Sequence, residues 1–151
     1  MRDLDEYHDL STTEYQALAE FRYQLRNFLA FSEQAARTVG LEPQQHQLLL
    51  VLKGLPKHDK VTIGDLAERL KIRHHSMVEL VDRVAEENLV QRRRDKQDQR
   101  RVLVTLTSHG NDVLRKLSML HHMELCLTGP ALVGALRAII SDTPVEETGK
   151  E

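Results

Sequence analysis

The sequence predicts a mainly α fold with a small β-hairpin wing: a winged helix-turn-helix whose N- and C-terminal helices form a dimerisation region. Two short helical patterns, Thr62–Leu70 and His74–Glu87, are separated by only about three residues. Two strand-like runs follow, Leu89–Arg94 and Arg101–Leu106, joined by the charged tip Asp95–Gln99. Helix, turn, helix and hairpin in this order define the fold.

Length and composition agree with one helical domain. The 151 residues are enough to bury a core, and aromatic residues make up 4% of the chain with no Trp, which favours helices over a β-sandwich. Cys126 is the one cysteine, so no internal disulfide is expected, and no Cys/His spacing predicts a metal site or cofactor. No apolar run approaches the ~20 residues that span a bilayer, and the N-terminus is too acidic for a signal peptide. A cytoplasmic protein without membrane contact is expected.

Spacing supports the two short helices. Apolar residues fall where two crossed helices bury side chains against each other: Leu66, Leu70, Ile72, Met77 and Leu80. Thr62 can cap the first helix with Asp65 as its partner, whereas no residue before the second helix is a good cap. No glycine stands in the turn, so the turn is predicted to form without a positive φ. Asn88 is predicted as a left-handed cap after the second helix.

Charge is concentrated in the hairpin. Residues 92–101 carry six basic and two acidic side chains, a local balance of +4, while the whole chain carries −2. A basic hairpin on an otherwise acidic protein indicates phosphate contact at one place. The alternative is that Arg92–Arg94 forms a solvated strand face.

This region resembles the MarR (multiple antibiotic resistance regulator) family of bacterial transcription factors. The resemblance rests on the helix Ser76–Arg83, on Asn88-Leu89-Val90, on Asp98-x-Arg100 in the wing, and on Leu106-Thr107-x-x-Gly110 after it. It extends over nearly the whole chain apart from the two ends. It implies a homodimer that reads a pseudo-palindromic double-stranded DNA operator, with half-sites about one helical turn apart, and that represses transcription.

The resemblance also implies which residues contact DNA. The second short helix would enter the major groove and offer Arg73, His74, His75 and Ser76, with Arg73 suited to a bidentate guanine contact. Arg100 would reach into the minor groove with Asp98 holding its side chain. The predicted DNA-binding residues are Thr62, Arg73, His74, His75, Ser76, Arg94, Asp98 and Arg100.

Helices are expected on both sides of this region. Ser11 and Glu14 form a capping box that opens a helix ending at Gly40, and about 27 residues of helix span roughly 40 Å, too long for one small domain to cover. After the wing, one helix is expected to about Cys126 and a second over residues 131–141, separated by a break at Thr128-Gly129-Pro130. The chain is therefore divided into dimerisation helices (11–40 and 107–141), a winged helix-turn-helix lobe (43–106) and a disordered tail (142–151).

Regulation is less clearly encoded. A small-molecule effector pocket, as the resemblance implies, could be lined by Tyr15, Leu18, His46 and Leu50, but these are generic core residues. Cys126 is predicted as a buried structural residue in preference to a redox sensor. His121 and His122 point about 100° apart on a helix and are poorly placed to share a metal ion.

The sequence also bears on two other classes of function. An enzyme is not expected, because the chain has no phosphate-binding glycine loop, no nucleophile with a nearby base and no paired carboxylates in an apolar setting. A winged-helix protein-interaction module without specific DNA binding is the main alternative. Asp98, Arg100 and the surrounding basic residues favour the DNA-binding hypothesis over it.

Overall fold

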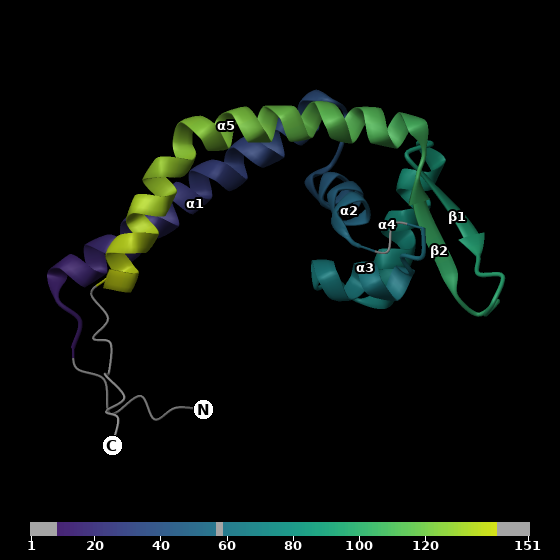
Figure 1. Ribbon diagram of the computed structural model, residues 1–151, viewed down its shortest axis with the longest axis horizontal. Helices are drawn as coiled ribbons and strands as arrows, with labels where there is room; N and C mark the ends of the chain where they lie inside the picture. The colour runs from purple at the N-terminus through teal and green to yellow at the C-terminus, as the bar shows by residue number, and fades with distance from the viewer. Residues whose placement is uncertain (1–8, 57–58, 142–151) are drawn as a thin grey trace, which may run out of the picture. The chain divides into compact units, whose positions relative to one another are not determined.

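The structure, a computed structural model, describes residues 9–56 and 59–141 (Figure 1). It divides into two compact units. Residues 32–121 form the central unit; the described residues of the other, called here the terminal unit, are 9–31 and 122–141. In chain order the elements are α1 (Thr12–Thr38), α2 (Pro43–Gly54), α3 (Ile63–Leu70), α4 (His74–Glu86), β1 (Val90–Arg94), β2 (Val102–Leu106) and α5 (Ser108–Ser141).

The expected winged helix-turn-helix lies in the central unit, where α2, α3 and α4 pack against one another and against the hairpin (Figure 1). The side chains at its centre are almost entirely apolar and fully buried: Leu48, Leu49, Leu66, Met77, Leu80, Val81, Val84 and Leu89. Burying each of them contributes about 1.5–3 kcal/mol to folding before entropy is counted. The predicted core of the two short helices is therefore confirmed at Leu66, Met77 and Leu80, whereas Leu70 and Ile72 are half-buried.

The turn between α3 and α4 differs from the prediction. Lys71 adopts a left-handed conformation with φ 55°, so the expectation of a turn without a positive φ was wrong. This conformation brings the Ile72 N–H to the Ala67 carbonyl at 3.0 Å and so satisfies a carbonyl at the end of α3. A lysine occupies the position that glycine would adopt with less strain.

Hydrogen bonds confirm both predicted capping boxes. The Ser11 N–H donates to Glu14 at 2.6 Å and the Glu14 N–H to the Ser11 hydroxyl at 3.2 Å. The same exchange links Thr62 and Asp65 at 3.0 and 3.1 Å and fixes the start of α3.

The hairpin is a two-stranded antiparallel sheet with register from Val90↔Leu106 to Arg94↔Val102. An isolated bridge, Thr62↔Leu103, attaches the start of α3 to β2. Val90, Leu103 and Val104 are buried against the helices, so the hairpin is fixed to the core at its base.

The junction between α4 and α5 explains the Leu-Thr-x-x-Gly pattern. Asn88 has φ 58°, which confirms the predicted left-handed cap. The Thr107 hydroxyl donates to the Asn88 carbonyl at 2.6 Å and accepts from the Gly110 N–H at 2.9 Å, so one side chain caps α5 and ties it to the end of α4. Gly110 lies so close to Leu89 that a Cβ atom would stand 2.0 Å from the Leu89 carbonyl oxygen.

The predicted break at Thr128-Gly129-Pro130 is wrong, because α5 is one continuous helix that passes through Pro130 (Figure 1). Proline in a helix removes one N–H and crowds the preceding turn. The Thr128 hydroxyl donates to the Glu124 carbonyl at 2.9 Å in that turn. Apolar residues lie on both sides of Pro130 in α5. Burying them against another surface would favour a continuous helix over a break.

The terminal unit has almost no core of its own. Of its described residues, 9–31 and 122–141, Ala135 alone is buried. Large apolar side chains are exposed on both helices, among them Tyr15, Leu18, Tyr23, Leu29, Met123, Leu127, Val133, Leu136 and Ile140. Cys126 is also exposed, so its predicted burial does not occur within one chain.

Helix α5 also corrects the expectation that no apolar run is long enough for a bilayer. It contains an 18-residue window of mean hydropathy 1.5, of which 6% is buried. Length and composition alone are weak evidence, since the core helix of an assembled protein passes the same test. The predicted tail, residues 142–151, lies outside the described residues.

Candidate nucleic-acid interface

The first turn of α4 presents the residues predicted to read the major groove. Arg73, His74 and His75 are exposed and Ser76 is half-buried, while Met77 begins the buried face of the helix. No side chain caps this helix, as the sequence predicted; Arg73 occupies the N-cap position. The N–H groups of the first turn and the positive end of the helix dipole are therefore open to an anion.

The tip of the wing is a hydrogen-bonded turn. The Asp98 carboxylate accepts from the Arg100 N–H at 3.1 Å, and the Asp98 carbonyl accepts from the Arg101 N–H at 2.9 Å. The Asp95 N–H donates to the Arg101 carbonyl at 2.9 Å and closes the loop. Asp98 was expected to hold the Arg100 side chain. Its carboxylate instead binds the Arg100 backbone N–H and so orders the backbone at that residue. The Arg100 side chain is exposed.

The three consecutive arginines of β1 each contact a different part of the central unit. Arg92 pairs with Asp82 of α4, Arg93 donates to the Asp59 carbonyl at 3.1 Å, and Arg94 donates to the Gln99 carbonyl at 2.8 Å. A solvated strand face is therefore an incomplete description of this run. Sequence reasoning missed the Arg92–Asp82 pair, because Asp82 lies ten residues earlier on another element.

Thr62 and Arg94 have structural partners in addition to their predicted roles. The Thr62 hydroxyl accepts from the Asp65 N–H, and its own hydrogen remains a donor. Arg94 uses one of its five donors on the wing tip. Both positions keep the capacity to contact a phosphate.

The residues suggested for an effector pocket are divided between the two units. Within the central unit, His46 is 4% exposed and its ring lies 4.8 Å from that of His121, while Leu50 is 49% exposed. Tyr15 and Leu18 are exposed on the terminal unit. Burial, and secondarily the neighbouring His121, lowers the pKa of His46 from 6.5 to about 4, so this imidazole is neutral near pH 7.

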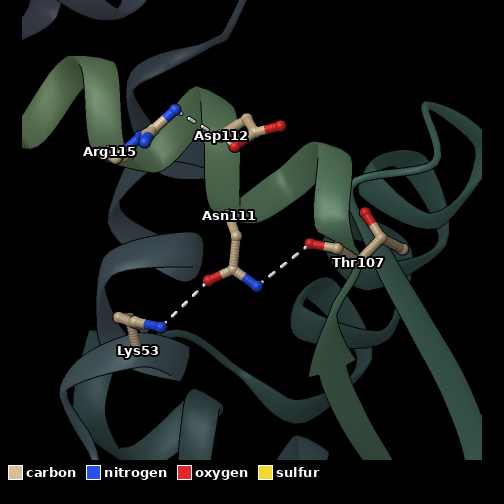
Figure 2. Close-up of polar contacts among 5 residues, drawn as sticks. All are labelled: Lys53, Thr107, Asn111, Asp112 and Arg115. Carbon is tan, nitrogen blue, oxygen red and sulfur yellow. Dashed lines mark hydrogen bonds and ion pairs between the residues drawn. The ribbon is translucent and has the colours of Figure 1, made fainter.

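A groove of about 500 Å³ does lie in the central unit between α2 and the first turns of α5. Leu50 and Leu114 provide its apolar lining, and Lys53 and Arg115 its positive charge. Figure 2 shows its polar contacts: Lys53 donates to the Asn111 side chain at 3.1 Å, and Asn111 donates to the Thr107 carbonyl at 3.2 Å. Arg115 pairs with Asp112 at 3.4 Å on the same helix.

Side chains of the kinds that bind metal ions occur at several places in the described part of the chain. Among the described residues, no group of three or more His, Cys, Asp or Glu side chains could hold an ion. His121 accepts or donates at the Ser32 hydroxyl (2.8 Å), while His122 lies 3.8 Å from the Cys126 sulfur, so the two adjacent histidines have different neighbours.

Comparison with known proteins gives consistent matches. The MarR family model matches residues 39–101, which include α2, α3, α4, β1 and the wing tip. The transcriptional repressor MdtR of Bacillus subtilis is 31% identical over 72 residues, covering 48% of this chain and 44% of MdtR. The aligned region thus spans less than half of that relative.

Solved structures are similar over more of the chain. AbsC, a MarR family transcriptional regulator from Streptomyces coelicolor, has a TM-score of 0.64 at 22% identity. The superposition covers 93% of this chain and 87% of the AbsC chain. A mutant of Staphylococcus aureus MepR bound to an oligodeoxyribonucleotide has a TM-score of 0.64 at 21% identity, covering 88% and 98%. At these identities the likeness establishes the fold.

Proposed function

We propose that the chain is a MarR-type, sequence-specific DNA-binding transcriptional regulator; the match of the MarR family model to residues 39–101 supports this proposal. It acts as a homodimer that represses transcription from a pseudo-palindromic operator. The observation that carries the proposal is the pairing, in one unit, of an uncapped helix with an exposed basic first turn and an ordered wing tip with Arg100 exposed.

The first turn of α4 and the wing tip have different roles in DNA binding. Arg73, His74, His75 and Ser76 contact base edges and phosphates in the major groove, with Arg73 as the guanine reader. Arg100 enters the minor groove, where its guanidinium meets the most negative potential in a narrow A·T-rich segment. Thr62 and Arg94 contact phosphates, and Asp98 holds the backbone from which Arg100 projects.

The homodimer is supported by the apolar surface of the terminal unit. Exposed side chains such as Leu127, Met123 and Ile140 (78%, 61% and 61% exposed) would be costly in water at this density. A second copy covers them in the proposed assembly and gives α5 the buried environment that a long apolar helix requires. A homodimer also supplies two copies of α4, one for each half-site of a palindrome.

Release by an effector belongs to the same proposal. The groove between Lys53 and Arg115 suits a small molecule with an apolar body and one carboxylate or phenolate, since Lys53 lies beside a leucine lining and Asp112, which also lines the groove, pairs with Arg115. Its polar contacts lead through Asn111 to Thr107, which also binds the carbonyl that follows α4. The protein is proposed to work in the cytoplasm, without membrane contact and without enzymatic activity.

The test is fluorescence anisotropy with the intergenic DNA upstream of the protein's own gene and a scrambled duplex of equal length, across a salt series. Arg100→Gln should weaken operator binding by about 10- to 100-fold, because a minor-groove arginine is worth about 1–3 kcal/mol. Arg37→Gln removes the same charge from an exposed position of α1, outside the proposed interface and the groove, and is the matched control.

The alternatives predict different results. Equal, weak binding to both duplexes, unchanged by Arg100→Gln, would refute the regulator and favour a protein-interaction module. A steep loss of affinity with salt, with preference for the upstream duplex, would support the proposal.

A further inference from the structure

The ion pair between Arg92 and Asp82 connects the two parts of the proposed interface. Asp82 lies on α4, which carries the major-groove reader, and Arg92 lies on β1, which leads to the wing tip. The ion pairs Arg37–Glu33 and Arg115–Asp112 each join residues of one helix, whereas this pair joins two elements. The side chains remain about half exposed, at 45% and 43%.

Such a pair contributes little to folding stability, since exposed ion pairs lose most of their energy to solvent and side-chain entropy. Its geometric effect is larger. The hairpin is held by the short turn around Asn88 and by the main-chain bridge between Thr62 and Leu103. Neither of these contacts joins β1 directly to the middle of α4, and the Arg92–Asp82 pair does. Arg92 stands opposite the buried Val104, within the anchored base of the hairpin, and the chain continues from it through Arg93 and Arg94 to the wing tip.

We propose that Asp82 and Arg92 are positioning residues that set the distance between α4 and the wing, so that both grooves are read at once. The inference rests on the proposed function. DNA fixes the separation of its major and minor grooves. A displacement of about 1 Å between α4 and the wing therefore weakens the contacts of both elements with DNA. Arg92 therefore acts through Asp82 and not by binding a phosphate.

The sign of one substitution separates the two roles. Asp82→Asn removes a negative charge from a surface that faces a polyanion, so charge alone predicts tighter DNA binding. Positioning predicts weaker binding, because Arg92 loses the partner that holds the hairpin. Glu86→Gln is the matched control: it makes the same change of charge on an exposed residue of the same helix.

The experiment measures anisotropy of the full chain with the upstream duplex for Asp82→Asn, Arg92→Gln, their combination and Glu86→Gln. Each single variant of the pair should bind about 3- to 10-fold more weakly, and the double variant no more weakly than either one, because both remove one interaction. Glu86→Gln should bind as well as the unaltered protein or slightly better. Tighter binding by Asp82→Asn, or additive losses in the double variant, would overturn the inference.

A second measurement tests the wing itself. Arg100→Gln is introduced into the Asp82→Asn variant. If the wing is misplaced in that variant, Arg100 already makes a weaker contact with the minor groove, and removing its charge costs less affinity. The cost of Arg100→Gln should fall at least threefold relative to the unaltered background; an equal cost in both backgrounds would contradict positioning.

The two hypotheses fail in different ways. If the unaltered protein does not distinguish the upstream duplex from the scrambled one, the proposed function fails. If it does, and Arg100→Gln weakens binding while Asp82→Asn behaves as Glu86→Gln, only the positioning inference fails.

Discussion

Replacing Gly110 with alanine tests the junction that joins the helix-turn-helix lobe to α5. A Cβ at this position would lie 2.0 Å from the Leu89 carbonyl oxygen and 2.9 Å from the Leu89 carbonyl carbon. Ordinary contact begins near 3.4 Å, so the two backbones must separate by about 1.4 Å. Backbone on both sides, rather than a flexible side chain, has to move.

That movement breaks specific interactions. The Leu89 carbonyl accepts from the Thr107 N–H at 3.1 Å, and the Thr107 hydroxyl donates to the Asn88 carbonyl at 2.6 Å. Overpacking costs about 1–3 kcal/mol, and each lost hydrogen bond about 1 kcal/mol. The expected loss for Gly110→Ala is therefore about 3–5 kcal/mol, a large fraction of the roughly 5–15 kcal/mol that holds a domain folded.

The assay is urea unfolding followed by far-UV circular dichroism, at one fixed protein concentration because a dimer's stability depends on it. Gly64→Ala is the control, because a Cβ at Gly64 meets only the Thr62 hydroxyl at an ordinary 3.6 Å. It should stabilise the protein by about 0.5 kcal/mol through helix propensity and unfolded-state entropy. A loss under about 1 kcal/mol for Gly110→Ala would refute the close-approach reasoning.

Three further predictions concern the central unit. Because burial and His121 lower the pKa of His46 to about 4, the unfolded chain binds a proton below pH 6.5 that the folded chain does not. The free energy of unfolding should fall by about 3 kcal/mol from pH 6.5 to 4, and His46→Gln should lack this part of the pH dependence in urea unfolding; an unchanged pH dependence would count against it. Lys71→Gly should raise the unfolding free energy by about 1 kcal/mol, since φ 55° suits glycine; a lowered midpoint would contradict the strain argument. Thr107→Val should lose about 1–2 kcal/mol with its two hydrogen bonds, and a neutral result would show that water replaces them.

The fold was predictable because its signals are local. Capping boxes at Ser11 and Thr62, periodic apolar residues in α3 and α4, and the charged tip each specify an element within a few residues. Two predictions about where a helix ends were wrong. Pro130 was expected to end a helix but lies inside a continuous one, and Lys71 was expected to avoid a left-handed conformation but adopts it at the end of α3, where the Ile72 N–H donates to the Ala67 carbonyl.

The candidate site divides in the same way. Exposure of Arg73, His74 and Arg100 follows from their places at a helix start and a loop tip. The Arg92–Asp82 pair and the backbone contact of Asp98 could not be read from the sequence, since each depends on the path of the hairpin relative to α4. From sequence alone, a run of basic residues predicts phosphate contact. The sequence does not show which of these residues face solvent and which pair with a carboxylate of the same chain.

Selection of bound duplexes from a random DNA library tests the central claim most directly. The protein should enrich a pseudo-palindrome whose half-sites are about one helical turn, roughly 10 base pairs, apart. The Arg100→Gln variant should show a weaker sequence preference at the positions between or beside the half-sites. Enrichment of no motif at moderate salt would contradict a sequence-specific dimeric regulator.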